Sequence, residues 1–325
     1  MNSEIIECPL CQHHLTNAPV SIYGLEAAAE HFAPINRNPE RYQRLKNTIQ
    51  GIWGGRSSAF FYRCPACDFG FGFPHQGGNE AFYGILHESP GYPTWRWEYE
   101  VGYAAQKNYT ANSAILDIGT GDGQFLLPIQ DPKWQRYATE NSDTNREKLR
   151  QQGIQIIEHE HFDEWESRFD VVTMFQVLEH IAEFKTVLNS TYGILKKGGR
   201  VVVSVPDCEN MTVQETLIGY ADMVPNHINK WSPKSLAMAM AEAGFAIEAV
   251  VPEKAGFKNF LDNLQYKLRA VATQKGSLAQ QIYAIENKKL RILGLASISL
   301  YYALGLLPHL SYCLKGKTFA IVGKK

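Results

Sequence analysis

Residues 115–126 read ILDIGTGDGQFL, an apolar run that breaks into three glycines within five residues before apolar residues resume. The apolar run predicts a buried strand, and the glycines predict a tight turn at its carboxyl end. Glycine tolerates positive φ and lets the backbone approach a ligand closely. Because α/β sheets bind ligands at the carboxyl ends of their strands, this stretch predicts a ligand-binding turn.

From residue 113 onward, predicted strands alternate with helical stretches. This alternation indicates an α/β fold with a mostly parallel sheet covered on both faces. The predicted strands are 113–119, 136–140, 153–158, 169–175, 199–206, 245–251 and 317–325. A helix is predicted after residue 231, because Ser232 can cap it, Pro233 fits its first turn and Gly244 can end it.

The composition limits which binding partners and which cellular compartment are expected. A chain of 325 residues can bury one large core and carry smaller attachments. Lys and Arg number 32 against 33 Asp and Glu, so no overall field attracts nucleic acid. The first ten residues have neither a basic start nor a long apolar run, which predicts no secretory signal and a cytoplasmic location.

Four of the six cysteines form two Cys-Pro-x-Cys pairs, Cys8 with Cys11 and Cys64 with Cys67. Each spacing suits a tight turn that aims two thiolates at one ion, and structural zinc takes four such ligands. The pairs therefore predict a structural zinc site, with buried thiols or a redox pair as alternatives. Three nearby histidines could substitute as ligands: His13, His14 and His75.

The segment between the two pairs is rich in polar residues and glycine, so the N-terminal unit is expected to need its ion to fold. The remaining cysteines, Cys208 and Cys313, are expected to pack as small hydrophobic side chains. The predicted divisions are a zinc-binding unit (1–78), an aromatic helical connector broken at Pro90 and Pro93 (79–112), the sheet domain (113–255 with 315–325) and a helical insertion (256–314).

Residues 292–314 carry no formal charge and match the length of a membrane-spanning helix. Pro308 and several polar residues weaken a spanning interpretation. The sequence favours a soluble helical cap over the active site. An interfacial element on the inner face of the membrane, through 290–314, and a true span are the alternatives.

The glycine turn departs at one position from the Gly-x-Gly-x-x-Gly pattern of nicotinamide dinucleotide binding, so a dehydrogenase is a weaker alternative. Gly119, Gly121 and Gly123 alternate, and Gln124 occupies the position of the third glycine. With Asp117 before it, the turn resembles motif I of class I S-adenosylmethionine-dependent methyltransferases. This resemblance implies a Rossmann-like sheet of seven strands, mostly parallel, with an antiparallel last strand.

Further segments in the same order strengthen the resemblance, which covers residues 113 to about 255 plus the last strand. They are FDVVTMFQVLEHI (169–181), LKKGGRVVVSVPD (195–207) and NHINKWSPKSL (226–236). The last of them is similar to the His-x-x-x-aromatic-Ser-Pro stretch of small-molecule methyltransferases. The four-cysteine module also resembles that of some bacterial methyltransferases, whose acceptors are sugar carbons, small molecules or lipid-linked metabolites.

The resemblance assigns roles to individual residues. Glu140 is expected to bind the ribose hydroxyls, and Gln176 lies in the region beside the methionine part of the cofactor. Glu160 is expected to contact the adenine amino group, with Glu158 or His161 as alternatives. The implied cofactor-binding residues are Asp117, Gly119, Thr120, Gly121, Asp122, Gly123, Glu140, Asn141, Glu160 and Gln176. Asp117 and Asp122 have a second interpretation, as caps of the turn amides.

Methyl transfer is an in-line displacement that depends mainly on alignment and exclusion of water. A hydroxyl or activated carbon acceptor also needs a general base, and His227 is the first candidate, followed by His180. Either histidine could instead only order its own loop. The connector aromatics could close over the cofactor with Arg96, or could simply pack between domains: Tyr83, Tyr92, Trp95, Trp97 and Tyr99.

The predicted activity is therefore methyl transfer from S-adenosylmethionine to a small-molecule, sugar or lipid-linked acceptor. An RNA methyltransferase is disfavoured by the balanced charge and by Met174-Phe175-Gln176-Val177, which is not an Asn-Pro-Pro-Tyr type motif. A non-enzymatic protein that binds the cofactor or docks on a membrane is the other alternative.

Overall fold

The computed structural model describes residues 5–35, 38–88, 94–106, 109, 112–218, 223–272 and 274–325. Pro90, Tyr92 and Pro93 of the predicted connector lie outside the described residues.

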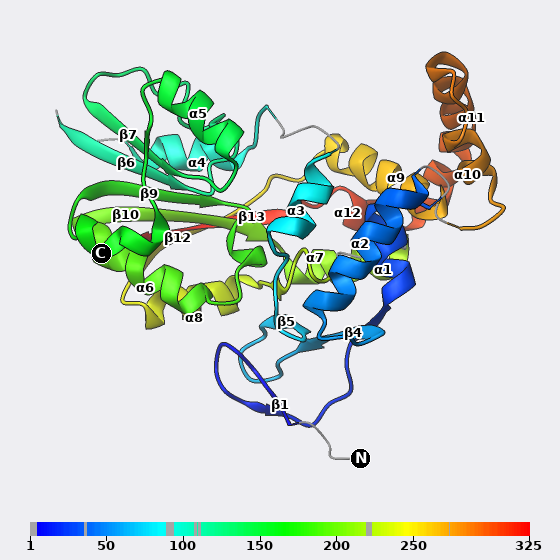
Figure 1. The fold of residues 1–325 in the computed structure, drawn as a ribbon, viewed down its shortest axis with the longest axis horizontal. Helices are drawn as coiled ribbons and strands as arrows, with labels where there is room; N and C mark the ends of the chain where they lie inside the picture. The colour runs from blue at the N-terminus through cyan, green and yellow to red at the C-terminus, as the bar shows by residue number, and fades with distance from the viewer. Residues whose placement is uncertain are drawn as a thin grey trace.

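A seven-stranded sheet forms the centre of the fold, in the order β12-β13-β10-β9-β6-β7-β8 (Figure 1). Its strands are β6 (Ser113–Ile118), β7 (Trp134–Thr139), β8 (Gln155–Ile156), β9 (Phe169–Phe175), β10 (Leu195–Pro206), β12 (Ala246–Pro252) and β13 (Thr318–Lys324). The first five are parallel, whereas β13 runs antiparallel to both β10 and β12. The predicted Rossmann-like fold class and antiparallel last strand are confirmed.

Helices cover both faces of this sheet because successive strand residues point to opposite sides. Ile115 packs with the helices α4 (Glu98–Ala105) and α5 (Asp143–Gln151). Its neighbour Leu116 packs on the other face with α6 (Phe184–Ile194) and α8 (Pro233–Glu242). Helix α8 has the predicted ends, with Ser232 in a capping box and Gly244 at φ +103°.

The N-terminal part has its own small sheets and helices. Its elements are β1 (Ile6–Glu7), β2 (His14–Leu15), β3 (Ser21–Gly24), α1 (Leu25–Phe32), α2 (Pro39–Ile52), β4 (Ser58–Arg63), β5 (Gly70–Phe73) and α3 (Glu80–His87). Strand β11 (Asn229–Lys230), from the predicted sheet domain, joins this sheet in the order β11-β5-β4-β3. The two predicted domains therefore share a sheet.

Between the main strands lie the shorter elements η1 (His159–Trp165), η2 (Leu178–His180), α7 (Cys208–Val213) and η3 (Gln214–Ile218). The insertion is helical, as predicted: α9 (Phe257–Ala272), α10 (Leu278–Tyr283), α11 (Lys288–Leu306), η4 (Leu307–His309) and α12 (Leu310–Cys313). Helix α11 projects from the rest of the molecule (Figure 1).

Candidate functional site

The turn after β6 requires its glycines. Gly119, Gly121 and Gly123 have φ of +69°, +61° and +83°. A Cβ on Gly119 would lie 2.8 Å from Cγ2 of Val177, and one on Gly123 would lie 2.4 Å from Cδ2 of Leu149. Conformation and space both exclude larger residues, which leaves the backbone exposed to a ligand at the carboxyl end of the strand.

Glu140, at the end of β7, holds the turn. Its carboxylate accepts hydrogen bonds from the amides of Gly121 and Ser142, each at 2.9 Å. Asn141 beside it is exposed. A carboxylate offers about four acceptor positions, so Glu140 can still accept hydrogen bonds from a pair of ligand hydroxyls.

The two predicted aspartates differ in position. Asp117 lies buried beneath the turn, where its carboxylate accepts a hydrogen bond of 2.6 Å from the Thr173 hydroxyl. Burial raises the pKa of Asp117 to about 7. Asp122 is partly exposed and accepts a hydrogen bond from Gln124, the residue that interrupts the dinucleotide pattern. Thr120 donates its amide to the Thr139 carbonyl, which joins the turn to β7.

Gln176 follows β9 with φ +59°, a left-handed conformation unusual for a residue other than glycine. Its amide nitrogen Nε2 donates to Oε1 of Glu98 at 3.0 Å. Glu98, on α4, is 2% exposed, and burial raises its pKa. Glu98 could not be predicted from the sequence, because a single acid in an aromatic-rich segment carries no local pattern.

A cleft of about 1040 Å³ opens beside Gln176. Its walls come from α1, α4, the ends of β10 and β12, the loop that carries His227, and α9. Trp95 and Arg96 of the predicted aromatic lid line it. The cleft therefore adjoins the carboxyl ends of the parallel strands, where an acceptor can approach a cofactor.

The two predicted histidines lie together. Their ring centroids are 4.6 Å apart, and His227 lines the cleft. Nδ1 of His180 is 2.8 Å from the Asn226 carbonyl and 3.1 Å from the Tyr83 hydroxyl. Nε2 of His180 is 3.9 Å from Oε1 of Glu179, which is fully buried. Glu179 was part of the quoted Leu-Glu-His segment, but its role had not been predicted.

The other connector aromatics pack rather than line the cleft as a group. Trp97 donates to the Thr318 hydroxyl at 2.7 Å, although it also reaches the cleft. Tyr99 packs against Phe125 and Phe175 in the core. Tyr99 is therefore a packing residue. Trp95, in contrast, is about half exposed and lines the cleft.

The adenine contact stays a prediction. Glu160 is exposed on η1. Glu158 pairs with Arg146, and Nδ1 of His161 lies 3.0 Å from the carboxylate of Glu164.

Lys317 could not be predicted either, because it begins the predicted strand 317–325 and nothing in its local sequence marks it as a site residue. It lines the cleft on the side of α9, with its ammonium over the Tyr266 ring at 4.5 Å and 3.9 Å from Asp262. Burial lowers the pKa of Lys317 to about 8. The cleft therefore contains a lysine whose pKa lies well below the usual range for this side chain.

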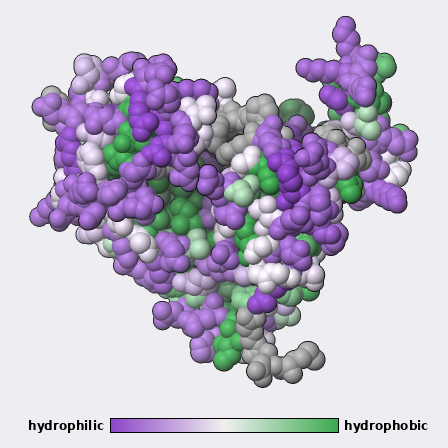
Figure 2. Space-filling model, viewed as in Figure 1, coloured by the Kyte–Doolittle hydropathy of each residue, from purple (hydrophilic) through white to green (hydrophobic). Residues whose placement is uncertain are grey.

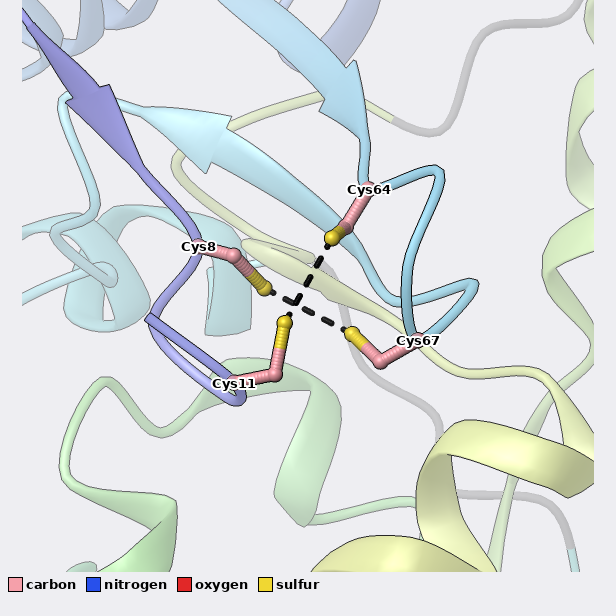
Figure 3. Close-up of side chains that lie close together, drawn as sticks. All are labelled: Cys8, Cys11, Cys64 and Cys67. Carbon is pink, nitrogen blue, oxygen red and sulfur yellow. Dashed lines mark hydrogen bonds between the residues drawn. The ribbon is translucent and has the colours of Figure 1, made fainter. Parts of the chain in front are cut away.

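The four paired cysteines converge, as Figure 3 shows. The Sγ atoms of Cys8 and Cys67 are 3.6 Å apart, and so are those of Cys11 and Cys64. A zinc tetrahedron with bonds of about 2.3 Å has edges of about 3.8 Å, so these sulfurs fit its corners. Disulfides, with sulfur separations of about 2.05 Å, do not fit.

The alternative histidine ligands are placed elsewhere. His75 bonds to Asn229 at 2.7 Å, whereas His13 and His14 are exposed. Cys208 and Cys313 are both fully buried, as predicted.

Lysines of the sheet domain hold both cysteine turns. Lys185 on α6 donates to the carbonyl of Leu10, and Lys234 on α8 donates to the carbonyl of Ala66. The cysteine cluster also shares a hydrophobic core with the central sheet. The cluster is therefore part of the main fold.

Residues 97–250 match the family model described as a methyltransferase domain. An S-adenosylmethionine-dependent methyltransferase from Archaeoglobus fulgidus shares 15% identity, with 75% of this chain and 100% of that chain covered and a TM-score of 0.49. A putative methyltransferase from Bacillus halodurans shares 14% identity over 70% of this chain and 98% of that chain, with a TM-score of 0.45. The match spans the central strands and the glycine turn, so residues 97–250 are similar to a methyltransferase domain.

Proposed function

We propose that this protein transfers a methyl group from S-adenosylmethionine to a small-molecule, sugar or lipid-linked acceptor held in the cleft. The observation that carries the proposal is the continuity of the site. A Cβ on Gly119 would lie 2.8 Å from Val177, the residue after Gln176, and both Gln176 and His227 line the cleft.

The residues of the turn fit the cofactor. The space that a Cβ would fill at Gly119 and Gly123 is already taken, so only backbone faces the ligand. Glu140 keeps acceptor positions for the ribose hydroxyls, and Gln176 is fixed by Glu98 beside the expected methionine end. When bound, S-adenosylmethionine supplies a methyl group on a positively charged sulfur. The buried Glu98 carboxyl and the cleft walls orient the reactants and exclude water.

His227 serves as the general base, because it faces the cleft and can accept the acceptor's proton on its imidazole. The ring of His180 lies against that of His227 and supports its role as a base. The Asn226 carbonyl can only accept a hydrogen bond, so Nδ1 of His180 carries a proton and Nε2 faces Glu179. Once His227 takes up a proton, the buried Glu179 carboxylate stabilises the positive charge of the histidine pair.

A structural zinc ion held by Cys8, Cys11, Cys64 and Cys67 completes the proposal. The separations of 3.6 Å suit four thiolates around one ion, and four ligands leave no open position for catalysis. The zinc contributes folding free energy.

Calorimetric titration of the zinc-replete protein with S-adenosylhomocysteine, beside NADH, tests the cofactor. Glu140→Ala should weaken binding about tenfold or more, since it removes a charge-assisted contact to the ribose. Glu147→Ala, an exposed change on α5, is the matched control and should bind normally. Binding of NADH instead would overturn the proposal. No binding of either ligand would favour the non-enzymatic alternative.

A further inference from the structure

Helix α11 exposes an apolar stripe that is interrupted at Ser297. Four of its members lie on one face of α11 at spacings of three, seven and four residues, and the fifth begins η4 three residues later: Leu290, Leu293, Leu300, Leu304 and Leu307. Each is at least 50% exposed, and Tyr301 beside them is 74% exposed. In Figure 2 the visible face of the projecting segment is largely purple, with green apolar residues along its outer edge. Exposed apolar side chains of this size, gathered on one face, indicate a surface that binds another molecule or a membrane.

The opposite face of α11 packs on the insertion. Ile298 contacts the cluster of Leu268 and Ile282 from α9 and α10. At the C-terminal end, Leu306 packs with Phe260 of α9 and with Cys313. The segment from Lys288 to Cys313 is long and apolar enough to cross a membrane, and little of it is buried in protein, although Ile298 and Leu306 hold it to the insertion. This arrangement suits a helix that lies on a membrane surface.

The charged residues of α11 itself are all cationic, and the exposed Glu286 lies two residues before the helix begins. Lys288, Lys289 and Arg291 lie at the N-terminal end of α11, and residues 288–325 contain no Asp or Glu. A second copy of α11 would offer no acidic partner for these cations, although the leucine spacing would permit helix pairing. An anionic lipid surface supplies both the apolar depth and the negative charge.

We propose that α11 docks the protein on an anionic phospholipid bilayer, with its leucine stripe at the level of the headgroups and acyl chains. Helix α9, which packs on α11, also forms one wall of the cleft. Helix α9 therefore connects the docked helix to the cleft. This inference depends only on the insertion and goes beyond the proposed methyl transfer.

Co-sedimentation with vesicles tests the docking of the full chain. The vesicles contain phosphatidylcholine alone, or phosphatidylcholine and phosphatidylglycerol in equal parts. We expect binding to the anionic vesicles. The double variant Leu293→Glu/Leu300→Glu should reduce the partition coefficient about tenfold or more, because two apolar side chains lose their burial. Ile22→Glu, an equally exposed apolar residue on β3, is the control and should bind like the wild type.

A second variant tests how much the cationic side chains contribute to vesicle binding. Lys288→Gln/Lys289→Gln should weaken binding to the anionic vesicles about tenfold, with little effect on the neutral ones. Wild-type protein that binds neither vesicle, or a leucine variant that binds like the wild type, would overturn the proposal. Sedimentation of the wild type as a dimer that the leucine variant converts to a monomer, without vesicle binding, would assign the stripe to a second copy. Titration of each variant with S-adenosylhomocysteine separates loss of docking from loss of the cofactor site.

Discussion

The Gly72 amide donates a hydrogen bond of 2.8 Å to the Ile228 carbonyl, so β5 of the N-terminal sheet is tied to the residue that follows His227. Asn229 then pairs with Phe71 through β11, and its side chain bonds to His75. The cysteine cluster lies one turn before β5. The N-terminal sheet therefore positions the loop of the proposed base.

Gly72→Ala tests this coupling. A Cβ on Gly72 would lie 2.3 Å from Cγ1 of the buried Val224, so the loop must shift. We expect about 1–3 kcal/mol of destabilisation by urea unfolding and a lower kcat, with unchanged affinity for S-adenosylhomocysteine. Gly24→Ala in the same sheet is the control, because a Cβ there meets nothing within 4 Å. Equal effects of the two substitutions would contradict the coupling.

His227→Ala should reduce kcat about tenfold or more and leave cofactor affinity unchanged, because a general base acts only in the chemical step. The measurement is methyl transfer to an acceptor found by screening, with calorimetry for the cofactor. His14→Ala, an exposed histidine on β2, is the control. Turnover at the wild-type level would remove His227 from the chemistry.

Glu179→Gln keeps the shape of the side chain and removes its charge. If Glu179 stabilises the protonated histidine pair, the variant should move the acid limb of the kcat profile to lower pH and lower the maximum rate. The pH profile is the readout, since a purely structural role would lower the rate without moving the limb.

The cysteine cluster predicts one zinc ion per chain by elemental analysis. Cys64→Ser should release the metal and destabilise the N-terminal sheet, because zinc modules gain on the order of 10 kcal/mol from their ion. Cys208→Ala, at a buried cysteine outside the cluster, should retain the metal. Full metal content in Cys64→Ser would exclude this site.

Asp117 predicts a pH dependence of stability. Its pKa is about 7 when folded and about 3.9 when unfolded, so between these values the folded chain holds a proton that the unfolded chain releases. The free energy of unfolding should therefore fall as pH rises through this window, by up to about 1.4 kcal/mol per pH unit from this group. In urea unfolding across the window, Asp117→Asn should lose this slope. The exposed control Asp163→Asn should keep it.

The strands and the cysteine site could be predicted because each has a local pattern. Short apolar runs that alternate with helical stretches indicate the seven strands, and the two Cys-Pro-x-Cys pairs indicate the cysteine cluster. Glu98 and Lys317 could not be predicted, since only the folded chain brings them to the cleft from positions far from the glycine turn. The exposure of α11 was equally hidden, because an apolar helix has the same composition whether protein or another surface covers it.

Strand β13 is made last among the strands, yet it lies between β10 and β12. Until residues 318–324 have left the ribosome, β12 has no neighbour in the sheet and one edge of β10 stays unpaired. The sheet must therefore remain open while the whole helical insertion is synthesised, and its closure depends on contacts distant in sequence, which form slowly. A chain truncated at residue 317 would leave the apolar edge of β10 free to pair with other chains, so aggregation should accompany loss of these seven residues.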